Sequence, residues 1–278
     1  MSAENFGAHT LLRIAQFAYT RRLRWRLDSV VQRTGGAALL LKRHPVFFRA
    51  LFDQFFDARF SARDRFDAVA ADIKFVVPQI SRCWPEYLQS FEPIVLWRPD
   101  HSIYRAEFSV NDQTPQEGLW RLCLARQDGV RVYSLTFSVV HDKLVIGSMQ
   151  GPPPVADALA VIRQATKDLH GLRPHVLLVD VARSVAHAWA LKRLCGVDPS
   201  HQLKAAPDSS DTERVHFDYR GFWAELGGAR APDGYWSLPL VSVSKPLEAI
   251  ESKKRAMYRA TRDHAGRPAT PNRPPVCA

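Results

Sequence analysis

The sequence predicts an α+β fold in which an antiparallel β-meander is flanked by helices. Two changes of pattern along the 278 residues support this class. Apolar residues recur at helical spacing up to about residue 90, β-branched and aromatic runs follow, and helical spacing returns after the prolines at 152–154. Because helices precede and follow the sheet, an α+β arrangement is favoured. We expect an N-terminal helical layer at 1–90, an α+β domain at 91–262 and a disordered tail at 263–278.

Three helices are predicted in the N-terminal layer. The first spans His9–Leu27 and mixes apolar residues with five arginines, which is typical of an amphipathic helix with a basic side. The second places apolar residues three and four positions apart between Phe47 and Phe60, which predicts a wide buried stripe. The third is expected over Asp64–Val77 and should end there, because Pro78 disfavours helical geometry in the residue before it.

Five strands are expected in the meander. Asp128-Gly129 is the expected turn between the third and fourth strands, and His141-Asp142 the turn between the fourth and fifth. Gly227-Gly228 provides a stop for the last helix of the domain. The predicted strands are Ile94–Trp97, Tyr104–Val110, Leu119–Ala125, Val130–Val140, Leu144–Ser148, Arg193–Val197 and Tyr235–Val243, and the predicted helices are Ala156–Leu169, Pro174–Leu191 and Asp218–Leu226.

Charge and cysteine content narrow the functional classes. The net charge is +10, but residues 1–50 carry +7 and residues 245–278 carry +5, so the middle of the chain is at −2. Because the middle lacks a basic excess, no nucleic-acid partner is expected. The four cysteines lie far apart, which predicts free thiols and no zinc site. No apolar leader and no apolar run of about 20 residues is present, which predicts a cytoplasmic protein without a membrane span.

The first candidate site is Val145–Pro154, a strand that runs into a glycine-containing turn before a helix. Main-chain N–H groups at such a turn favour an anion. In the acetyltransferase (GNAT) superfamily this crossover holds the pyrophosphate of coenzyme A, and the order of elements here resembles that fold. Gly147, Gln150 and Gly151 are therefore candidates for binding an acyl-CoA or acyl-carrier-protein thioester. The three prolines lack an N–H, so a plain turn with proline starting the helix is the alternative.

Two further stretches supply candidate side chains. At the junction of two predicted helices, Arg173 is a candidate for binding a phosphate and His170 for acting as a base. Cations at the end of a helix also stabilise its last carbonyls, which is the structural alternative. Tyr219 is a candidate proton donor to a leaving thiolate, and its alternative is a buried tyrosine with one hydrogen bond.

One pattern imitates a metal centre. His216 and Asp218, with His264 and Arg273 downstream, match the residue types of the iron site in 2-oxoglutarate oxygenases. Asp218, however, is predicted to begin a helix, where that fold needs a strand. We therefore expect no metal.

Several separate motifs along the chain resemble those of a known family. In order, they are His44-Pro45, Ile146–Pro152, Lys167 with His170–Pro174, Asp218-Tyr219 with Phe222-Trp223 and Leu226–Gly228, and Ser252–Tyr258. On these motifs the chain is similar to the VirK/YbjX family of proteobacterial proteins over about 44–262. Members are associated with virulence, surface display of an outer-membrane protein and tolerance of cationic antimicrobial peptides, and no reaction is established for them. The resemblance therefore implies a role at the Gram-negative envelope.

Two functional hypotheses follow. The first is an acyltransferase-like protein that moves an acyl group from a thioester to an envelope component or peptide, and it requires the bend after Met149 to expose main-chain donors close to Tyr219. The second is a non-catalytic factor that binds a client protein or the anionic surface of the inner membrane. Its basic ends would contribute about 1 kcal/mol for each charge near the lipid.

Overall fold

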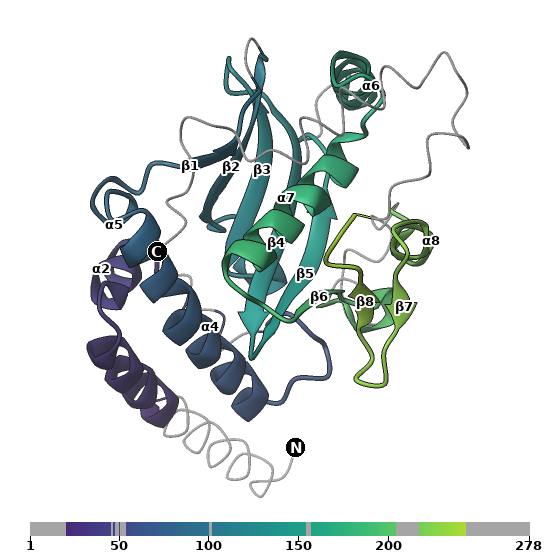
Figure 1. The fold of residues 1–278 in the computed structure, drawn as a ribbon. Coiled ribbons are helices and arrows are strands. Elements are labelled where there is room, and N and C mark those ends of the chain that lie inside the picture. Colours follow the sequence, from purple (N-terminus) through teal and green to yellow (C-terminus); the bar gives the residue numbers. More distant parts are fainter. Residues whose placement is uncertain are drawn as a thin grey trace, which may run out of the picture.

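The computed structural model describes residues 21–45, 47, 50, 54–99, 102–153, 157–203 and 217–242. Within them lies an eight-stranded sheet of order β1-β2-β3-β4-β5-β6-β8-β7 (Figure 1). Its strands are β1 (Ile94–Trp97), β2 (Tyr104–Val110), β3 (Trp120–Arg126), β4 (Arg131–Val140), β5 (Lys143–Gln150), β6 (Arg193–Gly196), β7 (Ala229–Arg230) and β8 (Trp236–Leu238). The α+β class and the antiparallel meander are confirmed, and the sheet is mixed because β6 pairs with β5 in parallel.

Local turns determine the order of the meander. Between β3 and β4, Gly129 takes a left-handed φ of 85° and its N–H donates to the Arg126 carbonyl. Between β4 and β5, His141 takes a φ of 58°. Such left-handed residues match the twist of hairpin strands, so consecutive strands become neighbours.

Helices cover the sheet on the side shown in Figure 1, where α4 and α7 both cross its face. Trp189, which follows α7, joins them: its ring meets Phe75 of α4 and also Phe108 and Phe137 of the sheet. The helices are α2 (Ala37–Arg43), α4 (Ala62–Cys83), α5 (Tyr87–Ser90), α6 (Ala158–Asp168), α7 (Pro174–Ala188) and α8 (Tyr219–Glu225), with 3-10 turns η1 (Pro115–Glu117) and η2 (Pro199–His201). Residues 21–33 are also helical.

A buried carboxylate fastens α4 to the sheet. Asp72 is 0% exposed and accepts hydrogen bonds from Trp120 Nε1 (2.5 Å) and from the Val139 N–H (2.7 Å). Burial raises the pKa of Asp72 to about 7, although these donors lower it. Because a buried polar group is costly without partners, these bonds select one position of α4 against β3 and β4.

Two predicted helices differ from those observed. The helix α4 continues through Pro78 to Cys83, because the loss of one hydrogen bond is offset by Ile80, which stays buried in the core. A single helix to Phe60 is wrong, since residues 54–60 are not helical and Phe56 has a φ of 65°. Phe55 and Phe56 are nevertheless buried, so the apolar spacing marks burial there without helical structure.

Several predictions fall partly or wholly outside the described residues. These are the first part of the His9–Leu27 helix, the tail at 263–278 and Cys277. Cys83, Cys123 and Cys195 are free thiols, as predicted. The last predicted strand is shorter than expected and is represented by β8 alone.

In the part of the chain that the structure describes, no helix combines the length and apolar character needed to cross a bilayer.

Candidate functional site

The parallel strands β5 and β6 separate after four residue pairs, which run from Lys143 with Arg193 to Ile146 with Gly196. One further bond joins the Val197 N–H to the Ile146 carbonyl (2.9 Å). Beyond this bond, β5 continues to Gln150, whereas the segment that follows β6 turns into η2. Ligands of sheets with parallel strands bind where the carboxyl ends of such strands diverge. The unpaired edge of β5 is therefore the candidate site.

A cavity of about 340 Å³ lies along this edge. Its volume is at the lower end of the range of small-molecule sites. The predicted site residues Gly147, Gln150, Gly151 and Tyr219 all line it. The other described lining residues are Phe56, Gln116, Glu117, Tyr133, Ser148, Met149, Gln202, Leu203 and Phe217.

Gly147 forms a bulge in β5. Thr136 pairs with Ser148 and the next residue of β4 pairs with Ile146, so Gly147 is the extra residue. A Cβ atom at Gly147 would lie 1.9 Å from the main-chain oxygen of Glu117, so only glycine fits. This close approach places η1 directly against β5.

The carboxylate of Glu117 reaches the cavity through this contact. Glu117 is 7% exposed and accepts hydrogen bonds from Ser148 Oγ (2.7 Å) and Gln150 Nε2 (2.5 Å). Thr136 Oγ1 donates to the main-chain oxygen of Glu117 (2.8 Å). The carboxylate is therefore oriented by two residues of β5, and it orients the amide of Gln150 in turn.

Two side chains take the place of a neighbouring strand on the free edge of β5. The Tyr219 hydroxyl accepts from the Met149 N–H (2.9 Å) and donates to the Met149 carbonyl (3.3 Å). Gln202 Nε2 donates to the Gly147 carbonyl (3.2 Å). Burial raises the pKa of Tyr219 far above the ordinary value of 10.0. Tyr219 is therefore a protonated phenol at neutral pH.

The bend after Met149 differs from the expectation of exposed main-chain donors. Tyr219 lies at the bend, where the acyltransferase hypothesis requires it, but it occupies the Met149 N–H. Pro152 and Pro153 have no N–H to offer, and residues 154–156 lie outside the described ranges. In the described part of the bend, the Met149 N–H is therefore bonded to a phenol and is not exposed as the hypothesis expects.

Two predicted residues lie apart from the described cavity lining. His170 follows the end of α6 with a left-handed φ of 55° and is exposed. Arg173 precedes α7 and forms an ion pair with Glu225 of α8. Neither residue therefore contributes to the described lining, and Arg173 already has an acidic partner.

Of the four residues that match the residue types of an iron site, Asp218 lies within the described ranges. Asp218 caps α8 by accepting from the Gly221 N–H (3.0 Å), as its predicted helix start requires. His216, His264 and Arg273 lie outside the described residues.

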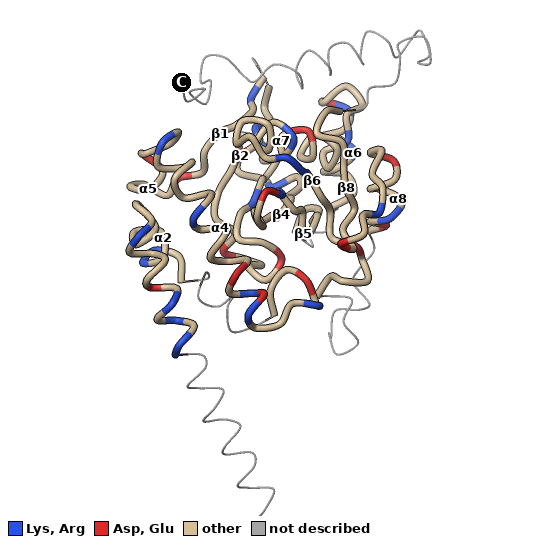
Figure 2. The backbone as a smooth tube through the Cα atoms, turned by 60° about the horizontal axis from the view of Figure 1, so that its bottom comes forward, with Lys and Arg blue, Asp and Glu red and all other residues tan. Residues whose placement is uncertain are grey.

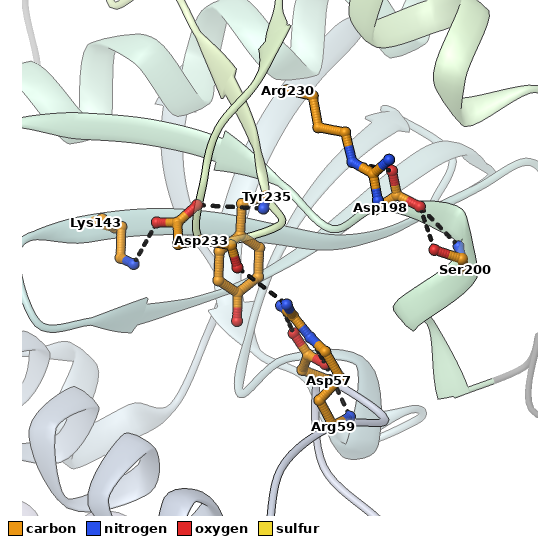
Figure 3. Close-up of polar contacts among 8 residues, drawn as sticks. All are labelled: Asp57, Arg59, Lys143, Asp198, Ser200, Arg230, Asp233 and Tyr235. Carbon is orange, nitrogen blue, oxygen red and sulfur yellow. Dashed lines mark hydrogen bonds and ion pairs between the residues drawn. The ribbon is translucent and has the colours of Figure 1, made fainter.

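A polar cluster holds one wall of the cavity (Figure 3). Asp57, which follows the lining residue Phe56, accepts from Arg59 Nε (2.9 Å) and Nη2 (2.6 Å). Arg59 Nη1 also donates to the Asp233 carbonyl (3.0 Å), and the Asp233 carboxylate accepts from Lys143 Nζ (3.1 Å). Although burial raises it, bonds from Arg59 hold the pKa of Asp57 below its ordinary value. The segment before α4 is thereby tied to the turn between β7 and β8.

A second group of polar contacts, around Asp198, holds another wall of the cavity (Figure 3). The Asp198 carboxylate accepts from the Ser200 N–H (3.0 Å) and from Trp236 Nε1 (3.0 Å), with Arg230 at 3.6 Å. Although burial raises it, these hydrogen bonds hold the pKa of Asp198 below its ordinary value. Because Asp198 positions η2, it also positions Gln202 at the cavity.

Sequence reasoning missed Glu117 and Gln202, which belong to connections rather than to the stretches singled out. One signal for the Glu117 contact was present. Gly147 stands inside a strand, directly after Leu144, Val145 and Ile146, and an isolated glycine in a strand marks a bulge or a close backbone approach.

The fold and site define an α+β protein with a ligand-sized cavity where two parallel strands diverge. The chain belongs to the family described as "Protein of unknown function (DUF535)", whose model matches residues 9–262. Its relatives include YbjX and LapB, so the predicted membership of the VirK/YbjX family is confirmed. The family carries no established reaction.

Three relatives illustrate the similarity. An uncharacterized protein of Haemophilus influenzae is 34% identical over 206 residues, 74% of this chain and 69% of that protein. "Membrane protein LapB" of Mannheimia haemolytica is 29% identical, covering 60% of this chain and 72% of its own. "Uncharacterized protein YbjX" of Escherichia coli is 26% identical, covering 56% and 48%. No solved structure matches the chain.

Substitution of Gly147 by alanine tests the close approach of η1 to β5. Gly147→Ala forces main-chain atoms apart, so we expect the free energy of unfolding in urea to fall by about 2 kcal/mol or more. Gly151→Ala is the matched control, because its Cβ would meet nothing closer than Ile162 Cδ1 at 3.6 Å. Equal stability of the two variants would contradict the contact.

Proposed function

We propose that the cavity is the active site of an acyltransferase. The acyl group would pass from a thioester, acyl-CoA or an acyl-carrier protein, to an envelope component or peptide. The observation that carries the proposal is the protonated phenol of Tyr219 at the diverging ends of two parallel strands. Ligands bind where parallel strands diverge, and the buried phenol there would donate a proton.

The described residues suit the thioester end of a donor. Met149, Leu203 and aromatic side chains of the lining provide apolar surface for the acyl group. Binding of the donor's phosphate groups has less support. The described prolines have no N–H to donate, and Arg173 would have to give up its ion pair with Glu225 to bind a phosphate. We therefore keep Gly147, Gln150 and Gly151 as the donor site.

Two side chains of the cavity would handle the protons. With an amine acceptor, the Glu117 carboxylate takes one proton from the ammonium group, and the freed nitrogen attacks the thioester carbonyl carbon. The carbon–nitrogen bond forms as the carbon–sulfur bond breaks, and the leaving thiolate takes the Tyr219 proton. The second nitrogen proton then restores the phenol, which leaves an amide, a thiol and one proton on Glu117. We assign the base to Glu117 rather than to His170, because Glu117 lines the cavity.

A thermal shift and a thiol-release assay test this proposal. We expect acetyl-CoA or a long-chain acyl-CoA to raise the unfolding temperature and to release free thiol when an amine is added. Tyr219→Phe should slow thiol release by about 100-fold or more, since general acid catalysis contributes at least that much. Tyr104→Phe is the control, because its hydroxyl binds Asp168 at 2.8 Å and lies outside the described cavity lining. No response to any acyl thioester, or full activity of Tyr219→Phe, would overturn the proposal.

We propose a second function, binding of an anionic membrane surface, on an independent observation. The helix at 21–33 buries one face and presents Trp25, which is 72% exposed, while Leu39 of α2 is 54% exposed. Figure 2 shows Lys and Arg along both helices. A tryptophan among cations is typical of an interfacial helix. The exposed cations are Arg21, Arg22, Arg24, Arg26, Arg33, Lys42 and Arg43.

Sedimentation with vesicles tests the membrane surface. We expect binding to phosphatidylcholine vesicles containing a third phosphatidylglycerol, and loss of that binding at high salt. Replacing Arg21 and Arg22 by glutamine should weaken binding about 30-fold, at about 1 kcal/mol per charge. The charge-matched control replaces Arg163 and Lys167, which are exposed on α6. Equal binding to vesicles without the anionic lipid would contradict the proposal.

A further inference from the structure

Three neighbouring strands, β2, β3 and β4, bring charged side chains together around one cysteine. Residues that pair directly across a sheet share a face, and so do residues two positions apart along a strand. Cys123 of β3 pairs with Glu107 of β2, and Arg121 lies two positions before it. The residue two positions after it pairs with both Arg105 of β2 and Arg131 of β4. Three arginines and one glutamate therefore share the face that carries Cys123.

Two of these arginines are bonded to neutral groups. Arg121 Nη2 donates to Ser109 Oγ (3.3 Å), and Arg131 Nη1 donates to Gln113 Oε1 (2.7 Å). The Nε atom of each is buried without a hydrogen-bond partner. A guanidinium group has five N–H donors, so one neutral acceptor satisfies a small part of it. Within the described ranges of the chain, neither Arg121 nor Arg131 forms an ion pair.

The charge of these two guanidinium groups is therefore left to attract an anion. Arginine stays protonated in proteins, and the third arginine, Arg105, is paired with Glu107. Arg121 and Arg131 are both half-buried, where a charge is poorly hydrated. Burial lowers the pKa of Arg131, and the nearby charge of Arg121 lowers it too. An anion placed between the two groups relieves this repulsion.

A phosphate group suits two arginines better than a carboxylate does. The planar guanidinium group presents two parallel N–H donors, which match two oxygens of one phosphate. A phosphate monoester carries about two negative charges at neutral pH and offers three acceptor oxygens, so one group can bridge both arginines. A carboxylate has a single charge and two oxygens, and it balances one of the two cations.

We infer that Arg121 and Arg131 bind the phosphate group of a small ligand on the face of the sheet that carries Cys123. Cys123 pairs with Ser134, and Ser134 pairs with Gln150, which lines the cavity. Two strand spacings of about 4.8 Å place the phosphate site about 10 Å from the cavity edge. That the phosphate belongs to the thioester donor rests on the proposed function, whereas the phosphate site itself requires no thioester.

Calorimetry on the wild-type protein tests the inference with three probes of similar shape. We expect phenyl phosphate to bind about tenfold or more tightly than benzoate, and phenol to bind more weakly than either. High salt should weaken the binding of phenyl phosphate, because it screens the attraction between the charges. Equal binding of phenyl phosphate and benzoate, or of phenyl phosphate and phenol, would overturn the inference.

Two further probes distinguish the source of the phosphate. Adenosine 3′-phosphate represents a small ligand, and a short-chain phosphatidic acid represents a lipid headgroup. We expect the nucleotide to bind more tightly than the lipid. Tighter binding of the lipid would overturn the assignment of the site to a small ligand.

Variants locate the charges that are responsible. Arg121→Gln and Arg131→Gln should each weaken the binding of phenyl phosphate about tenfold or more, and Arg121→Lys, which keeps the charge, should weaken it less. Arg163→Gln is the matched control, since Arg163 is exposed on α6. Unchanged affinity in the folded glutamine variants would contradict the assignment. If those variants do not fold, the three probes on the wild type decide.

The two proposals fail separately. Phosphate binding with no response to any acyl thioester leaves the phosphate site standing and removes the acyltransferase. Thiol release from acyl thioesters without discrimination between phenyl phosphate and benzoate does the reverse.

Discussion

The close approach of the Glu117 main-chain oxygen to Gly147 is the contact on which the candidate site depends. Because Gly147 has no side chain, η1 can pack directly against the bulge of β5. The same contact brings the Glu117 carboxylate to Ser148 and Gln150. Beyond the bulge, β5 no longer has β6 as a neighbour, and Tyr219 and Gln202 satisfy its edge instead. One steric constraint thus links a charge, a proton donor and a cavity.

Buried carboxylates hold the frame around that contact. Asp72 fastens α4 to the sheet, and Asp57 and Asp198 fix two walls of the cavity. Removing the partner of a buried charge is costly, whereas the pair itself adds little net stability. We therefore regard these carboxylates as determinants of position, which hold Phe56 and Gln202 at the cavity.

Much of the fold was predictable because its determinants are local. Asp128-Gly129 encodes a hairpin by its own backbone preferences, and Asp218 marks the start of α8 by its cap. The segment ending at Phe60 was mispredicted as helix because buried aromatic side chains recur there without helical hydrogen bonds. The end of α4 was mispredicted at Pro78, because the packing of the helix outweighs the one main-chain hydrogen bond that proline cannot form.

The site was predictable only where it lies in one segment. Gly147, Gln150 and Gly151 share a strand and its end, and Tyr219 joined them through the expected order of elements. Glu117 reaches the cavity from a connection between β2 and β3, and tertiary packing alone reveals this. His170 and Arg173 were singled out because basic residues gather where α6 ends and α7 begins, but His170 is exposed there and Arg173 pairs with Glu225 of α8.

The central claim is that the edge of β5 beyond Ile146 is a ligand site. Amide chemical shifts of the isotope-labelled protein during titration with acetyl-CoA and then with a long-chain acyl-CoA test it most directly. We expect the largest changes at Gly147, Ser148, Met149 and Gly151. Changes confined to another surface, or no changes along β5 with either ligand, would contradict it.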